Sequence, residues 1–95
     1  MNIVDCKTIE EVRENIDRID REIVGLISQR SRYVGQAAKF KKSMQDVKAP
    51  ARVEEIILKV RGLAVENHLD PDIIEKIYRT MIVCLIDYEL KAHKR

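Results

Sequence analysis

The sequence predicts an all-α protein with three helices per chain, of which the first is very long. Apolar residues recur at intervals of three and four over residues 8–42, which is the period of one helix face. The chain is 45% hydrophobic and 36% charged, with three Gly, two Pro and few aromatic residues. A helix of about 35 residues is about 50 Å long, several times the core width of so small a domain. We therefore expect residues 1–95 to form a single helical domain that pairs with a second copy as an intertwined homodimer.

The first helix is expected from Thr8 to about Lys42. Thr8 followed by Glu11 is a capping box, in which two side chains bond backbone N–H groups at the start of the helix. The apolar face that this helix would bury consists of Ile9, Val12, Ile16, Ile19, Ile23, Leu26 or Ile27, Val34, Ala37 and Phe40.

A polar connector over residues 43–49 separates the first helix from the second. Its length is ordinary for helices that turn back on one another. Pro50 suits the first turn of the second helix, because its missing N–H is not needed there. We expect this helix to end near Asn67.

The third helix is expected to begin at a turn with strong local signals. Asp70 is a natural N-cap and Pro71 a natural first residue of a helix. The apolar pattern continues to about Lys91. His68 lies in the turn and is interpreted as a solvated turn residue.

Composition excludes several classes of protein. The net charge is +2 with the two signs interspersed, so it gives no argument for a nucleic-acid partner. Cys6 and Cys84 have no ligand-like spacing, so we expect no metal or other cofactor, and interpret them as a terminal thiol and a small buried residue. The longest apolar run, residues 81–86, is too short to span a membrane, and we expect no signal peptide, because residues 1–4 are too short to supply its apolar region. A cytoplasmic location is expected.

Two long cations share the apolar side of the predicted first helix. Arg30 and Lys41 are 11 positions apart, which is about three turns, so they project from one side about 16 Å apart along the axis. Such a pair can grip a small anion, although stems lying on apolar surface with their heads in water would give the same pattern. Arg13 is rotated by roughly 100° from Arg30 and cannot reach the same ligand within one chain. It could enter the site of a partner subunit.

Glu89 is an acid on the predicted inner face of the third helix. It follows Ile82 by seven positions and Leu85 by four. A carboxyl in apolar surroundings tends to keep its proton and can then donate a hydrogen bond. A salt bridge to an interior cation is the alternative, and the sequence leaves both open. A further cation, Arg52, stands at the start of the second helix.

These residues resemble those of the all-helical chorismate mutases. The resemblance rests on QRSRYVGQAAKFK with Arg30 and Lys41, on APARVEEI with Arg52, and on the turn NHLDPDIIEKIYRTMI. It covers nearly the whole chain, about residues 5–91. Within the family, DCKTIEEVRENIDRID and the loop length before Arg52 are most similar to the isochorismate-pyruvate lyases, which make salicylate.

The resemblance implies a homodimer with two equivalent active sites and a dianionic substrate. Arg30 and the partner subunit's Arg13 would hold the two carboxylates of chorismate, and Arg52 would line the end of the pocket. Lys41 would bond the ether oxygen and one carboxylate, and Glu89 would face the same oxygen. The reaction implied is the pericyclic rearrangement of chorismate to prephenate, an isomerisation that leads to phenylalanine and tyrosine and needs no nucleophile or metal.

Three positions depart from the usual mutase pattern. Glu89 stands where many bacterial members carry Gln, so we predict that it works protonated and that activity falls as pH rises. Val53 and Ala49 stand where Glu and Asp are usual, which weakens recognition of the ring hydroxyl and resembles the lyase pattern. Chorismate mutase is nevertheless the preferred interpretation here. The alternatives are an isochorismate-pyruvate lyase and a non-enzymatic helical dimerisation or regulatory module.

Overall fold

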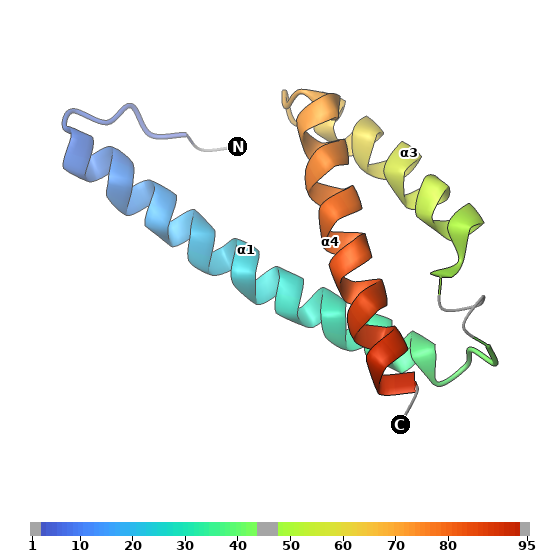
Figure 1. Cartoon of the computed structure of the whole chain (residues 1–95). Helices are drawn as coiled ribbons and strands as arrows, with labels where there is room; N and C mark the ends of the chain where they lie inside the picture. The colour runs from blue at the N-terminus through green and yellow to red at the C-terminus, as the bar shows by residue number, and fades with distance from the viewer. Residues whose placement is uncertain (1–2, 44–47, 94–95) are drawn as a thin grey trace. The chain divides into compact units, whose positions relative to one another are not determined.

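A computed structural model describes residues 3–43 and 48–93 of the chain (Figure 1). It is all-α, which confirms the predicted class. Three helices are described within these residues, namely α1 (Ile9–Ala38), α3 (Pro50–Glu66) and α4 (Pro71–His93). The first helix, with 30 residues, is the longest of them, as predicted. None of the helices described combines the length and the apolar character that crossing a bilayer would need.

The chain divides into two compact units, Met1–Val34 and Gly35–Arg95. The first unit is built on most of α1, and its beginning is capped as predicted. The backbone N–H of Glu11 donates to the Thr8 hydroxyl oxygen at 3.1 Å. The Glu11 carboxylate reaches back to the N–H of Lys7 at 2.9 Å, one residue before the N-cap itself. Both side chains of the capping box therefore satisfy backbone donors that the first turn leaves unpaired.

The apolar stripe of α1 is present but uncovered. No residue of α1 is buried, and Ile16 in the middle of the stripe is 50% exposed. The other exposed large apolar side chains on the part of α1 in the first unit are Ile9, Val12, Ile19, Ile23, Val24, Leu26, Ile27 and Tyr33. An amphipathic helix gains most of its stability by covering such a stripe, so this face calls for a second surface.

The first helix ends earlier than the sequence predicts. Its last residue is Ala38 rather than Lys42, and the backbone then tightens into three successive bonds between residues three apart, at Lys39, Phe40 and Lys41. Phe40, which the periodicity assigned to the buried face, is 82% exposed, so no burial holds this turn in α geometry. Lys41 is therefore not a residue of α1, which corrects the expectation that the first helix contains it.

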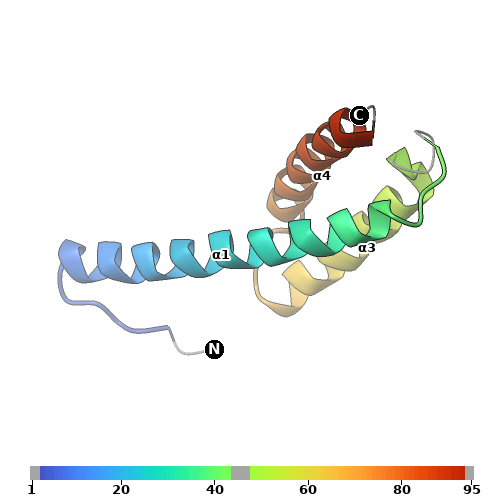
Figure 2. The same cartoon turned by 90° about the horizontal axis from the view of Figure 1, so that it is seen from below.

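The second unit contains an antiparallel hairpin of α3 and α4, which pack against each other (Figures 1 and 2). Pro50 opens α3 and Pro71 opens α4, as predicted. The Asp70 carboxylate accepts a bond from the N–H of Asp72 at 2.9 Å, which confirms it as the N-cap. His68 lies exposed in the turn with a positive φ of 60°. The N–H of the following Leu69 bonds the Ala64 carbonyl at 2.9 Å and closes the turn.

The core of this unit is the seam between its two helices. Ile57, Val60 and Ala64 of α3 and Ile82 of α4 are its buried apolar residues. Cys84, expected to be a small buried residue, is exposed on α4 instead. It lies two positions after Ile82, and neighbours two apart on a helix face different directions.

The polar connector predicted over residues 43–49 falls partly on residues 44–47, which lie outside the described residues. At its end, Ala49 has φ 36° and ψ 62°, a left-handed conformation, directly before the first turn of α3. Such a conformation is unfavourable for a residue with a Cβ.

Candidate functional site

The structure brings together two of the five predicted site residues, Lys41 and Glu89. The Lys41 ammonium lies 3.3 Å from the Glu89 Oε2 atom, although the residues are 48 positions apart in the sequence. Lys41 extends from the turn that follows α1, and Glu89 from the last part of α4, and both belong to the second unit. Of the two alternatives that the sequence left open for Glu89, the structure shows the salt bridge.

Burial distinguishes this pair from an ordinary surface ion pair. Glu89 is 8% exposed, and among the residues that the structure describes it is the charged residue that is buried. Its predicted position on the inner face of the third helix agrees with this burial. The Lys41 side chain is 22% exposed. A carboxylate this far from water needs a counter-ion, because an unpaired charge in apolar surroundings is strongly unfavourable. The pair offers one strong donor and one strong acceptor within hydrogen-bond reach of each other.

Arg52 lies in the first turn of α3 and has a counter-ion of its own. Its guanidinium bonds the carboxylate of Glu55, three residues further along the same helix. The Arg52 side chain is 56% exposed, so this cation is accessible to solvent.

Arg13 and Arg30 belong to the first unit and lie on α1. Arg13 is exposed, and Arg30 is partly buried and engaged in an interaction of its own. The placement of these two residues does not test their predicted roles, which remain predictions.

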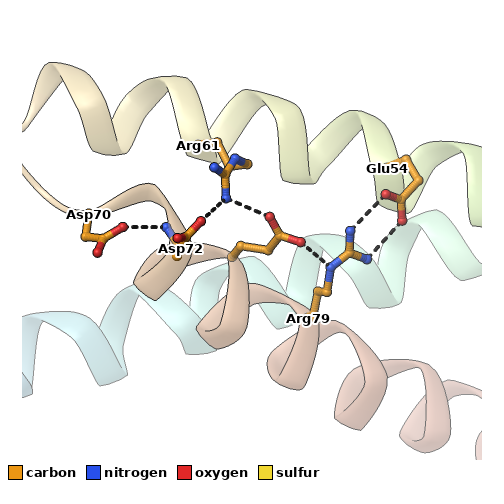
Figure 3. A network of polar contacts seen from close by, with 6 residues as sticks. Glu54, Arg61, Asp70, Asp72 and Arg79 are labelled. Carbon is orange, nitrogen blue, oxygen red and sulfur yellow. Dashed lines mark hydrogen bonds and ion pairs between the residues drawn. The ribbon is translucent and has the colours of Figure 1, made fainter.

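A network of ion pairs that was not predicted from the sequence connects α3 and α4 (Figure 3). Arg79 of α4 bonds both carboxylate oxygens of Glu54 on α3, each at 2.9 Å, and its Nε donates to Glu75 at 2.8 Å. Arg61 of α3 bonds Glu75 at 2.8 Å and Asp72 at 2.9 Å. No role was predicted for either arginine. Instead, both arginines tie the hairpin together and fix its register.

The network shifts the pKa values of its members in the directions expected for ion pairs. The hydrogen bond from Arg79 lowers the pKa of Glu54 and that of Glu75 below their ordinary value of 4.5. Hydrogen bonds to Glu54 and Glu75 in turn raise the pKa of Arg79. The carboxylates are therefore held in their charged form.

A signal for this network was present in the sequence. Glu75 and Arg79 are four positions apart, a spacing that favours an ion pair on one helix. Glu54, the partner of Arg79 on α3, is 25 positions away in the sequence and gives no such local signal.

Comparison with known proteins identifies the family. The profile described as chorismate mutase type II matches residues 12–90, a range that contains all five predicted site residues. The chain belongs to the type II chorismate mutase family. The resemblance inferred from the sequence is thereby confirmed, and membership implies a chorismate-type substrate.

Two known proteins that are similar to this chain differ from each other in activity. The isochorismate pyruvate lyase of Pseudomonas aeruginosa is 36% identical over 87 residues, which cover 92% of this chain and 86% of that protein. The chorismate mutase of Methanocaldococcus jannaschii is 31% identical over 75 residues, which cover 78% of this chain and 76% of that protein. This chorismate mutase family member is thus an enzyme of one of these two kinds, and it is more similar to the lyase over a longer stretch.

Proposed function

We propose that this protein is an isochorismate-pyruvate lyase, which splits isochorismate into salicylate and pyruvate. The observation that carries the proposal is the similarity to a lyase over 92% of the chain. The apolar residues Ala49 and Val53, which flank the start of α3, support it, because the acidic residues usual in mutases are missing there. From the sequence alone, chorismate mutase was preferred and the lyase was the alternative, so the order is now reversed.

The proposed reaction needs no nucleophile and no added base. A hydrogen leaves a ring carbon and joins the methylene carbon of the enolpyruvyl group, while the ether C–O bond breaks and the ring becomes aromatic. The enzyme has to fold a flexible dianion into the reactive conformation and stabilise negative charge on the departing ether oxygen. Fixed cations achieve both, by restricting conformers and by preorganised electrostatics.

Lys41 and Glu89 are the proposed residues at the ether oxygen. Lys41 would donate a hydrogen bond to this oxygen and to one carboxylate, and a protonated Glu89 would donate from the other side. Their 3.3 Å contact supports this assignment, because both groups can reach one small ligand atom. Arg30 and Arg52 are assigned to the ligand carboxylates and to the end of the site from the family resemblance.

We also propose that the active form is an intertwined homodimer in which the partner subunit's Arg13 completes the site. The support is the apolar stripe of α1, which contains no buried residue in the single chain. A second copy would supply an identical stripe and bury both. Such a dimer would present Arg13, on the exposed N-terminal part of α1, to the other subunit.

Chorismate mutase activity is the second candidate. The family profile carries that description, and the relative from Methanocaldococcus jannaschii is a mutase. The same cations would serve this reaction, since it also needs a compact dianion and a stabilised ether oxygen.

The experiment supplies purified protein with isochorismate and chorismate in parallel and identifies the products. Salicylate with pyruvate, formed faster than prephenate, is the expected result. Lys41→Ala should lower kcat about 100-fold or more, whereas Lys39→Ala, an exposed lysine two residues earlier, should leave it unchanged. Faster formation of prephenate would assign the protein as a mutase. Turnover of neither compound would overturn the proposed function.

A further inference from the structure

We propose that binding of the dianionic ligand takes up one proton from solvent, and that Glu89 receives it. The inference rests on the proposed function, in which Lys41 turns toward a ligand oxygen. It adds a property of the binding equilibrium that the reaction itself does not require, because conversion of isochorismate into salicylate and pyruvate consumes no proton.

The starting point is the state of the pair before the ligand arrives. The Lys41 ammonium and the Glu89 carboxylate lie 3.3 Å apart and neutralise each other. An approaching dianion therefore meets a neutral pair and not a free cation. For the ligand to use Lys41, its own oxygen atoms must replace the Glu89 carboxylate as the partner of the ammonium.

Water cannot stabilise the displaced carboxylate, because the side chain is buried. Glu89 is 8% exposed, and a buried carboxylate that loses its counter-ion is strongly destabilised. A ligand with two negative charges beside it adds repulsion. Taking up a proton removes both penalties and converts Glu89 into a donor that can bond the ligand.

Among the described residues of the second unit, the other charged side chains next to Glu89 and Lys41 in the sequence lie in more exposed positions, and the proposed site assigns Arg30 and the partner subunit's Arg13 to the ligand carboxylates. On α4 the charged neighbours Asp87 and Lys91 are exposed, and in the segment after α1 Lys39 and Lys42 are exposed as well. On α3, the nearest cation to the start of the helix is Arg52, which is occupied by Glu55. Lys41 is the cation whose ammonium bonds Glu89.

The Arg52–Glu55 pair provides an internal contrast. The Glu55 side chain is 63% exposed, so a ligand that displaced it from Arg52 would release it into water as a hydrated anion. That exchange needs no proton. The two ion pairs together therefore predict an uptake of one proton and not two. The proton is added to a Glu89 carboxylate oxygen from solvent and returns to solvent when the products leave.

Isothermal titration calorimetry measures this uptake. The probe is the lactyl ether of isochorismate, which keeps both carboxylates and the ether oxygen but has a methyl group where the reaction needs the methylene carbon of a C=C double bond. Titrations at one pH in PIPES, HEPES and Tris, whose ionisation enthalpies differ, give the number of protons bound. We expect about one proton per site near neutral pH, and a Kd that rises about tenfold per pH unit where uptake is complete.

Two variants assign the proton. Glu89→Gln should bind the probe without uptake and with a Kd that is independent of pH. Glu66→Gln removes the same charge from an exposed position on α3 and should keep the wild-type uptake. In the wild type, the infrared C=O band of a protonated carboxyl should appear on binding, a readout that does not depend on any variant.

The outcomes separate this inference from the proposed function. Wild-type protein that binds the probe without proton uptake, or uptake that persists in Glu89→Gln, overturns the inference while the product assay still stands. Protein that neither binds the probe nor turns over isochorismate or chorismate overturns the proposed function itself.

Discussion

Replacing Ile16 by alanine tests whether the apolar stripe of α1 is a subunit interface. Ile16 is 50% exposed in the single chain, in the middle of the stripe. The substitution removes three carbon atoms, each of which contributes about 0.8 kcal/mol when fully buried. With half of the side chain already out of water, a homodimer that covers the rest would gain about 1.2 kcal/mol per chain from these atoms.

A two-fold interface contains the residue twice, so the loss per dimer is about 2.4 kcal/mol. At 1.4 kcal/mol per factor of ten, the dimer dissociation constant should rise about 50-fold. A cavity left in a packed interface would increase this value. If α1 faces water in the functional protein, the same substitution should change no association equilibrium at all.

Sedimentation equilibrium over a wide range of protein concentrations measures the dissociation constant. Ile57→Ala is the matched control, since it makes the same chemical change at a residue that is 3% exposed in the seam of α3 and α4. It should lower the free energy of unfolding by about 2–5 kcal/mol without a selective effect on association. A wild-type chain that sediments as a monomer throughout, or an unchanged constant in Ile16→Ala, would refute the reasoning.

Three further predictions concern the site, the backbone and the response to acid. Mixed Arg13→Ala and Lys41→Ala chains, each inactive alone, should regain about one working site per heterodimer; no recovery despite subunit exchange, verified by mass spectrometry, contradicts the donation of Arg13. Ala49→Gly should raise the free energy of unfolding by about 0.5–1 kcal/mol in urea titrations, because glycine adopts the left-handed conformation without the penalty of a Cβ; a destabilised variant would contradict this account. The lowered pKa values of Glu54 and Glu75 mean that their contribution to stability is present above the ordinary value of 4.5 and is lost as pH falls below it. Urea midpoints measured from pH 6 downward should therefore fall less in a Glu54→Gln variant than in the wild type.

The helix starts were predicted well because their signals are local. Thr8 with Glu11, and Asp70 with Asp72, bond within three residues of each other, so the sequence contains both partners side by side. The end of α1 was predicted less well. The apolar period continues to Phe40, but the helix ends at Ala38, since periodicity describes which side chains could be buried and not whether a surface is there to bury them.

In the candidate site, too, the features that depend on nearby residues were predicted and those that depend on distant residues were not. The burial of Glu89 followed from its spacing to Ile82 on α4 and is confirmed. Its salt bridge to Lys41 was one of two equal alternatives, because the partner lies 48 residues away beyond the end of another helix. The roles of Arg79 and Arg61 were missed for a similar reason, since Glu54 and Arg79 are separated by 25 residues.

The sequence by itself determined the helical class, the three helices, the family and the inward position of Glu89. Each of these depends on residues within about one or two helical turns of each other, or on a pattern repeated along the chain. Only the tertiary structure decided which cation neutralises Glu89 and which arginines bind α3 to α4. Those pairings depend on how the hairpin is folded and where α1 ends, because charges attract any neighbour of opposite sign and only the fold brings a particular one within reach.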